Sequence, residues 1–135
     1  MDKETIFTKI INGEIPCRKV YEDESTFAFF DISPFELGHT LVVPKKVYQT
    51  IFEMPNEEFI KLMLTVKKIA DYYYDVLGCG INIAQNNLKI AHQEVDHVHF
   101  HVIPRREEKH FYGNKSSNIY SKEEIDNIYR LLKMN

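Results

Sequence analysis

Residues 97–103 read His-Val-His-Phe-His-Val-Ile, so three histidines alternate with apolar residues. In a β-strand, successive side chains point to opposite faces, and the three imidazoles would share one face. In a helix, each step of two residues turns by about 200°, which would scatter the imidazoles. The pattern therefore predicts a strand over residues 95–103, closed by Pro104. One face would join the core, and the imidazole face would meet solvent, a ligand or other polar groups.

The remaining periodicity predicts helices and strands in an order that indicates an α+β fold. The longest helix is expected to be capped by Asn56 and ended by Gly78, because apolar residues recur between them at three- and four-residue spacing. Before it we expect a short helix capped by Thr5 and ended at Asn12-Gly13, a hairpin of strands 18–21 and 26–31, and a strand 39–43 ended by Pro44, with a connector 45–53. After it we expect a strand 80–85 and a loop 86–92. A mobile polar segment 105–120 would lead to a last helix, which has a capping box at Ser121 and Glu124. The hairpin and the loop favour antiparallel pairing.

Composition limits the class of protein. With 135 residues and 44% hydrophobic residues, the chain is expected to form one globular domain, and a disordered chain is excluded. The formal charge of −3 argues against a binder of bulk nucleic acid. A charged N-terminus and the lack of a long apolar run predict a cytoplasmic protein that neither enters nor crosses a membrane. Cys17 and Cys79 match no metal or redox spacing and are expected as two reduced thiols.

The alternating histidines leave three interpretations open. They could be surface residues without a role, although strict alternation on an apolar strand argues against this. They could bind a metal, but alternate strand positions lie about 6.6 Å apart, so His39 or Asp96 would have to assist. They could carry nucleophilic catalysis, because a neutral imidazole can attack phosphorus without a separate base. Flanking imidazoles would then fix the tautomer and stabilise developing charge.

The histidine run also resembles a known signature. Residues 93–103, Gln-Glu-Val-Asp-His-Val-His-Phe-His-Val-Ile, resemble the motif of the histidine triad (HIT) family. Blocks at residues 5–11, 13–16, 29–34 and 38–45 resemble the Hint-like branch of that family, in the same order. The resemblance covers residues 4–104, and residues 105–135 match less clearly.

The resemblance implies a fold and an activity. The fold would be a five-stranded antiparallel sheet with a long helix, in a single HIT-like domain over residues 1–135 with a C-terminal extension 105–135. Two copies would form a homodimer with a ten-stranded sheet. The activity would be hydrolysis at the α-phosphate of nucleoside 5′-phosphoramidates, or of related AMP-X and dinucleoside polyphosphate substrates, through a nucleotidyl-histidine. A purine nucleotide such as AMP or GMP, or adenosine, would be the ligand. The alternative is a nucleotide-binding regulatory module with little catalysis.

The resemblance also assigns roles to residues. His99 would be the nucleophile, His101 would contact the transferred phosphoryl group and assist the leaving group, and His97 and His39 would support His99. Nucleotide contacts would come from Asp31 at the ribose, Asn86 and Gln93 at ribose or phosphate, and Phe7, Ile10, Ile15, Phe29 and Ile32 around the base. From the residues alone, Asp31 could equally cap a turn, and the apolar residues could be core.

Four positions depart from the family pattern. Many members bind a structural zinc with a Cys pair and two histidines, and Thr5 and Thr8 stand where that pair would be. Because hydroxyls are poor zinc ligands, we expect no zinc and no other cofactor. Glu94 replaces a hydroxyl residue found in animal members and is a possible leaving-group contact. His92 stands where a glycine is usual, so His92 is strained if that position needs a positive φ.

Overall fold

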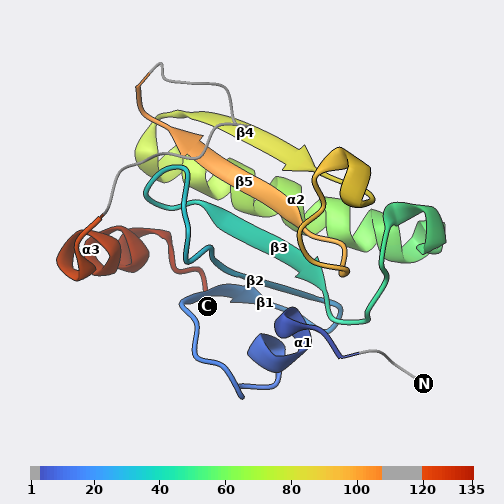
Figure 1. Cartoon of the computed structure of the whole chain (residues 1–135). Helices are drawn as coiled ribbons and strands as arrows, with labels where there is room; N and C mark the ends of the chain where they lie inside the picture. Colours follow the sequence, from blue (N-terminus) through green and yellow to red (C-terminus); the bar gives the residue numbers. More distant parts are fainter. Residues whose placement is uncertain (1–3, 108–119) are drawn as a thin grey trace.

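The five strands in the described part of the chain form one antiparallel sheet. The computed structural model describes residues 4–107 and 120–135. The strands are β1 (Lys19–Glu22), β2 (Thr26–Phe30), β3 (Thr40–Pro44), β4 (Gly80–Gln85) and β5 (Phe100–Arg105), in the spatial order β1-β2-β3-β5-β4 (Figure 1). Every neighbouring pair is antiparallel. The predicted α+β class and the five-stranded antiparallel sheet are confirmed.

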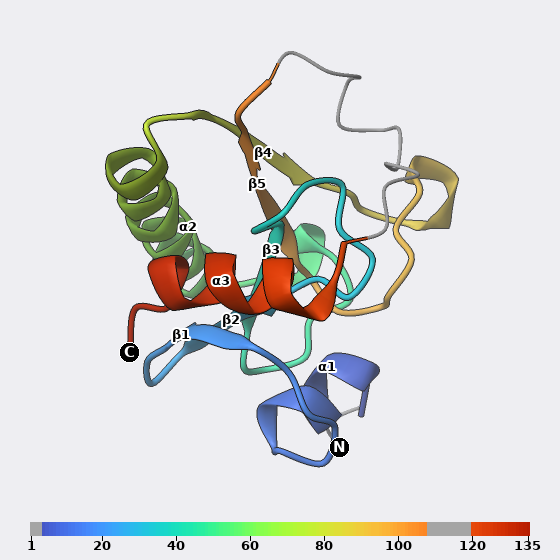
Figure 2. The ribbon, with the colours of Figure 1, turned by 90° about the vertical axis from the view of Figure 1, so that its left-hand side faces the viewer.

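Helices cover both faces of this sheet. The long helix α2 (Asn56–Leu77) and the C-terminal helix α3 (Lys122–Leu132) lie on one face, and the short helix α1 (Ile6–Ile11) lies on the other (Figure 2). The alternation along β2 follows this arrangement, since Phe30 joins the core under α2 whereas Phe29 packs with Phe7 of α1. All five residues of β2 are therefore buried.

The strand predicted over residues 95–103 is observed as β5 over Phe100–Arg105, so it begins five residues later and ends two residues later than predicted. β5 begins at Phe100, which pairs with Val42 of β3 and Gln85 of β4. Residues 95–99 precede it in an irregular segment. Pro104 does not close the strand, because it lies beyond the last pair with β3 and still pairs with Ile81 of β4.

The other boundaries lie close to the predicted ones, with small differences. Asn56 is the first residue of α2 rather than its cap, which is Pro55, and Gly78 ends the helix with φ 59°. The connector and the loop each contain one short 3-10 helix, η1 (Ile51–Glu53) and η2 (Lys89–Ala91). Most of the predicted mobile segment, residues 108–119, lies outside the described residues.

The C-terminal helix closes one edge of the sheet. The backbone N–H of Met134 donates to the carbonyl of Val20 in β1 at 2.8 Å, and the hydroxyl of Tyr129 donates to the carbonyl of Lys19 at 2.6 Å. Leu132 is fully buried in the core shared with α2. At the opposite edge, no further strand pairs with β4 within residues 4–107 and 120–135. The two edges of the sheet therefore differ.

Helix α2 has 22 residues but carries several charges. No helix in the described part of the chain combines the length and the apolar character needed to cross a membrane.

Candidate active site

His99 presents one ring nitrogen as a hydrogen-bond acceptor. Its Nδ1 lies 2.7 Å from the backbone carbonyl of His97. A carbonyl only accepts, so Nδ1 carries the proton and donates it to that bond. In the neutral ring, the lone pair then lies on Nε2. This is the arrangement that a nucleophilic imidazole needs.

His97 is held at both of its ring nitrogens. Nε2 lies 2.8 Å from the carbonyl of Pro44 and therefore carries the proton. Nδ1 lies 2.8 Å from the hydroxyl of Thr5, which donates to it. The side chain is fully buried. His97 is thus a fixed neutral ring, and its carbonyl orients His99.

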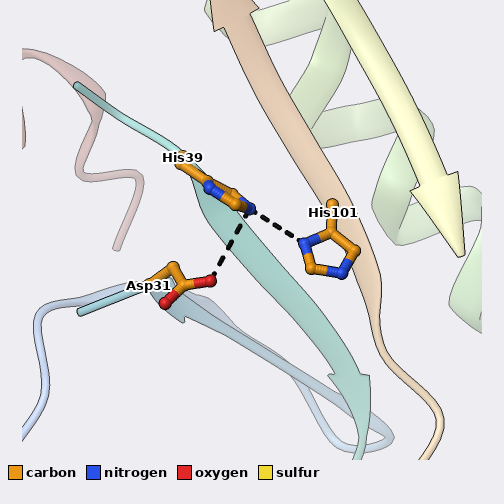
Figure 3. A group of neighbouring side chains, drawn as sticks. All are labelled: Asp31, His39 and His101. Carbon is orange, nitrogen blue, oxygen red and sulfur yellow. Dashed lines mark hydrogen bonds and ion pairs between the residues drawn. The ribbon is translucent and has the colours of Figure 1, made fainter. Parts of the chain in front are cut away.

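His39 and His101 form a second hydrogen-bonded chain (Figure 3). The backbone N–H of Phe35 donates to Nδ1 of His39 at 3.0 Å, so Nε2 of His39 carries the proton. That Nε2 lies 2.9 Å from Nδ1 of His101, which accepts, and the proton of neutral His101 is then on Nε2. His101 therefore offers an N–H donor beside His99, with ring centroids 5.2 Å apart.

The predicted support of His99 by His39 is therefore placed differently in the structure. His39 lies just before β3 and contacts His101 on the neighbouring strand β5, rather than His99. The ring of Phe35 stacks on His39 with centroids 5.1 Å apart, which holds the imidazole in this orientation. His39 thus orients the donor, whereas the carbonyl of His97 orients the nucleophile.

Asp31 joins this chain from the end of β2. Its Oδ2 lies 3.7 Å from Nε2 of His39, and Figure 3 shows the carboxylate pointing toward that ring. Its Oδ1 accepts a hydrogen bond from the backbone N–H of Ser33 at 2.9 Å. Both interpretations of Asp31 therefore have a structural basis, since it caps the turn and also faces the imidazoles.

Asp31, His39 and His101 each bring one potential metal-ligand atom within 4.8 Å of the others. The hydrogen bonds make this cluster a poor metal site. Nε2 of His39 holds a proton as long as Phe35 N–H donates to Nδ1, and a protonated nitrogen has no lone pair for an ion. Metal binding would need His39 to lose that bond and change tautomer.

Burial keeps the two inner imidazoles neutral. Desolvation is the largest cause that lowers the pKa of His99, and the pKa of His97 is lowered mainly in the same way. The carbonyl of His97 and the nearby carboxylates of Asp31 and Glu94 act against this for His99, because they favour the imidazolium form. Burial still dominates, so the pKa of His99 lies below the ordinary value of about 6.5.

The apolar residues expected around a base divide into two groups. Phe7 and Phe29 are buried, and Phe7 packs edge-on against His97 and His99 at 5.5 and 5.1 Å. Ile10 and Ile15 are half-buried, whereas Ile32 is 93% exposed. Phe7 thus supports the histidines and Phe29 packs behind Phe7 at 5.6 Å, whereas Ile32 is exposed to an incoming ligand.

A cavity of about 530 Å³ adjoins the cluster at Asp31 and His39. It lies between the start of β1, the loop from β2 to β3, and α3. Its lining residues are Pro16, Cys17, Arg18, Phe30, Asp31, Ile32, Pro34, Leu37, Gly38, His39 and Ile125. Of the predicted base contacts it includes only Ile32.

Asn86 and Gln93, the two polar residues predicted to contact ribose or phosphate, lie at opposite ends of the loop after β4 and have different surroundings. Asn86 directly follows β4, and its Nδ2 donates to the carbonyl of His92 at 3.5 Å. Gln93 is only 3% exposed, and its amide is used inside the protein. Its Oε1 accepts from the N–H of Leu88 at 2.6 Å, and its Nε2 donates to the carbonyl of Val95 at 2.9 Å. Gln93 holds the loop together in this structure, whereas Glu94 is exposed and its charge acts on His99.

Two residues of this loop have unusual backbone angles. His92 has φ 70° and ψ 27°, so the position where relatives have glycine does need a positive φ. The condition set for His92, a positive φ at this position, is therefore met. Leu88 has φ 76° and ψ 151°, a region that residues with a side chain seldom adopt. The bond from Leu88 to Gln93 helps to hold it there.

Three contacts of the site were missed by sequence reasoning: the hydroxyl of Thr5, the N–H of Phe35 and the carbonyl of Pro44. Thr5 lies 92 residues from its partner His97. No local pattern reports a bond over that separation, and backbone groups have no sequence signal. Only the folded chain brings these groups to the imidazoles.

Comparison with known proteins gives the site a context. The family model described as HIT domain matches residues 12–108. An uncharacterised HIT-like protein of Methanocaldococcus jannaschii is 54% identical over 102 residues, which cover 76% of this chain and 79% of the relative. The adenosine 5′-monophosphoramidase of Saccharomyces cerevisiae is 44% identical over 114 residues, which cover 81% of this chain and 67% of that enzyme.

A solved structure agrees with the arrangement of the whole chain. The crystal structure of a Hit-like protein from Bartonella henselae superposes with a TM-score of 0.85 at 34% identity, and covers 98% of this chain and 97% of that protein. The similarity thus extends past the region matched by the family model and includes α3.

Proposed function

The chain belongs to the histidine triad (HIT) family, and on that premise we propose that it is a hydrolase of purine nucleotides. Its substrates would be nucleoside 5′-phosphoramidates, or related AMP-X and dinucleoside polyphosphates, cleaved at the α-phosphate. The observation that carries the proposal is the free Nε2 of His99, because Nδ1 is committed to the carbonyl of His97. The identity of 44% with a yeast adenosine 5′-monophosphoramidase supports the phosphoramidate class.

The first step is attack by Nε2 of His99 on the α-phosphorus. The nitrogen–phosphorus bond forms while the bond from phosphorus to the leaving group breaks, which gives a nucleotidyl-histidine. Nε2–H of His101 donates to a phosphoryl oxygen and stabilises the developing charge. His39 keeps that donor in place through its own bond to His101. The leaving amine takes one proton from solvent.

The second step is hydrolysis of the nucleotidyl-histidine. Water attacks phosphorus, the bond to Nε2 of His99 breaks, and the nucleotide leaves. The attacking water gives up one proton, which balances the proton that departed with the amine. His99 returns to its neutral form with Nδ1–H still bonded to the carbonyl of His97. Burial supports this cycle because it disfavours protonation of the free ring.

Asp31 and Ile32 are the residues that we assign to the nucleoside. The carboxylate of Asp31 is a suitable acceptor for ribose hydroxyls, and it lies beside His39 at the catalytic cluster. Ile32 follows directly and is 93% exposed, which leaves its side chain available for the face of a base. The ribose contact would therefore set the distance between the base and the α-phosphate.

We also propose that the reaction needs no metal or other cofactor. Thr5 and Thr8 stand where many family members have a zinc-binding Cys pair, and in this chain the Thr5 hydroxyl is bonded to His97. Hydroxyls do not replace thiolates as zinc ligands. We expect metal analysis of the purified protein to find no stoichiometric zinc and a chelator to leave turnover unchanged. One zinc per chain would contradict this.

The test of the function is turnover of a fluorogenic adenosine phosphoramidate. We expect wild type to release AMP, and His99→Ala to lose activity by at least about 10³-fold because it removes the nucleophile. AMP binding by calorimetry should stay within about threefold of wild type, since the nucleoside contacts that we assign to Asp31 and Ile32 are retained. Full turnover in His99→Ala would overturn the assignment. Tight AMP binding by wild type without turnover would instead favour a regulatory module.

A further inference from the structure

A chain of hydroxyl and imidazole groups connects helix α1 to the catalytic histidines. Thr5 is the N-cap of α1, and its Oγ1 accepts a hydrogen bond from the backbone N–H of Thr8 at 3.2 Å. The same oxygen lies 2.8 Å from Nδ1 of His97. Thr5 therefore has a local contact, which caps the helix, and a distant one, which reaches the active site.

The direction of the distant bond is fixed by the other side of the ring. Nε2 of His97 must donate to the carbonyl of Pro44 at 2.8 Å. Neutral imidazole has one N–H, so Nδ1 can only accept, and the hydroxyl of Thr5 must donate. The side chain of His97 is fully buried, so no water replaces this donor if it is lost. An unsatisfied Nδ1 would then favour movement of the ring.

The position of His97 determines the position of the nucleophile. The carbonyl of His97 accepts from Nδ1 of His99 at 2.7 Å. Both residues precede β5, which begins at Phe100, so the regular strand ladder does not hold them. The backbone of this segment is held by isolated hydrogen bonds, such as that from the N–H of Val98 to the carbonyl of Tyr48. Side-chain contacts therefore contribute much of the order of this segment.

Helix α1 also contacts the segment through Phe7. The ring of Phe7 meets the rings of His97 and His99 edge-on, with centroids 5.5 and 5.1 Å away. Phe7 is 5% exposed and belongs to the cluster under α1. The Thr5 bond and the Phe7 packing thus come from one rigid element. A change that loosens Thr5 from His97 would move the carbonyl that orients His99.

We propose that Thr5 is a positioning residue that aligns His99 for attack through His97. The inference rests on the proposed hydrolase function and adds a residue to it. Thr5 does not touch substrate or the reacting atoms. Its role is to satisfy Nδ1 of His97, so that the carbonyl of His97 keeps the proton of His99 on Nδ1 and the lone pair on Nε2.

The test compares three variants in the same fluorogenic phosphoramidate assay. Thr5→Val keeps the shape and removes the donor, and Thr5→Ser keeps the donor. Thr8→Ala is the matched control, because it removes the other half of the capping box but leaves the Thr5–His97 bond. Thermal unfolding of each variant gives the loss of stability at α1.

We expect Thr5→Val to lower kcat about 10- to 100-fold, since small misplacements of reacting groups have effects of this size. KM should change less than about threefold, because Thr5 does not contact the nucleotide. Thr5→Ser should restore kcat, and Thr8→Ala should keep it. In a ¹H–¹⁵N spectrum, the Nδ1 resonance of His97 should shift in Thr5→Val and stay in place in the other two.

Two kinetic results would contradict the role proposed for Thr5. A kcat near wild type in Thr5→Val, or an equal loss of kcat in Thr8→Ala, would overturn it. The spectrum separates this failure from failure of the proposed function. If wild type does not turn over any nucleotide, the hydrolase proposal fails, whereas an unchanged Nδ1 resonance in Thr5→Val overturns the Thr5–His97 contact itself.

Discussion

For the individual residues of the site, the direction of each hydrogen bond determines what the side chain can do. In His99, Nδ1 donates to a carbonyl and Nε2 carries the lone pair. In His101, Nδ1 accepts a hydrogen bond and Nε2 carries the proton that can be donated. Two chemically identical side chains therefore differ in function because their partners differ. The partners are a carbonyl for His99 and the imidazole of His39 for His101.

This difference gives a pH dependence. The active form of His99 is neutral, and burial lowers its pKa, so activity should persist below the ordinary value of about 6.5. We expect the acidic limb of the kcat/KM profile, which reports the free protein, to lie below pH 6.5. Glu94→Gln removes a carboxylate that raises this pKa and should move the limb to still lower pH. A limb above 6.5 in wild type, or a shift to higher pH in the variant, contradicts the assignment.

The sequence could identify the imidazoles but not their connections. Alternation at His97, His99 and His101 predicted one strand face, but only His101 lies in β5. The three rings still gather together, since Phe7 of α1 contacts His97 and His99, and His101 neighbours His99. The attachment of His39 to His101 was not predictable, because it depends on which side chains meet across β3 and β5. For Gln93, which the resemblance assigns to the ligand, the sequence did not indicate that its amide bonds backbone groups of its own loop and the carbonyl of Gln49.

Among the elements, the loop between β4 and β5 is the most strained. Leu88 and His92 both have positive φ without being glycine. The loop carries Asn86 at one end and the catalytic segment at the other. Its geometry is held by Gln93 and by the pairing of Asn87 with Gln85 at 2.6 Å. Side-chain hydrogen bonds of Asn87 and Gln93 thus hold the loop in its strained backbone conformation.

Replacing His92 with glycine should relieve part of this strain. Glycine adopts φ 70° without a steric penalty, so we expect His92→Gly to raise the free energy of unfolding by up to about 1 kcal/mol. Urea unfolding followed by circular dichroism measures the change. Gly13→Ala is the opposite control, since its φ of 81° should make alanine destabilising. A clear loss of stability in His92→Gly would show that the side chain of His92 contributes more than its backbone strain removes.

The boundaries of a helix or strand were predictable where they depend on its own residues, and were not predictable where they depend on pairing with another element. Helix α2 begins and ends near its predicted limits because caps and periodicity are local. The start of β5 depends on where β3 and β4 can pair with it, and the first pairs form at Phe100. Proline in β5 also misled the prediction, because Pro104 lies beyond the last pair with β3, so its missing N–H interrupts no ladder on that side, while β4 still pairs with it.

In the whole molecule, α3 is part of the core rather than an appendage. Leu132 is fully buried, so Leu132→Ala should lower the free energy of unfolding by about 2–5 kcal/mol. Leu131 on the same helix is 54% exposed, and Leu131→Ala should cost less than about 1 kcal/mol. Equilibrium unfolding in urea compares them. Equal, small effects would mean that α3 does not pack as described.

The two edges of the sheet bear on assembly. α3 and the following residues cover β1, whereas β4 presents its outer edge, and Ile83 of β4 and Leu64 of α2 are 49% and 63% exposed. An open edge with apolar neighbours is suited to pairing with a second copy. We therefore propose a homodimer through β4, in which two sheets would join into one of ten strands.

Sedimentation velocity at micromolar concentration tests this. We expect wild type to sediment as a dimer and Ile83→Lys to shift toward monomer, because a buried lysine at the joined edge would be unpaired. Leu131→Lys, on the helix that covers the other edge, should remain dimeric. A monomeric wild type, or an Ile83→Lys protein that is as dimeric as wild type, would reject the β4 interface.

The position of α3 also has a consequence for synthesis of the chain on the ribosome. All five strands and both other helices are translated before α3, so a nascent chain can form the sheet while the outer edge of β1 is still uncovered. The loop at Gly38, where even a Cβ would meet Leu132 at 2.9 Å, then lacks its final support. Because an uncovered edge favours pairing with other chains, the interval before α3 emerges is the period in which this protein is most open to aggregation and to chaperone binding.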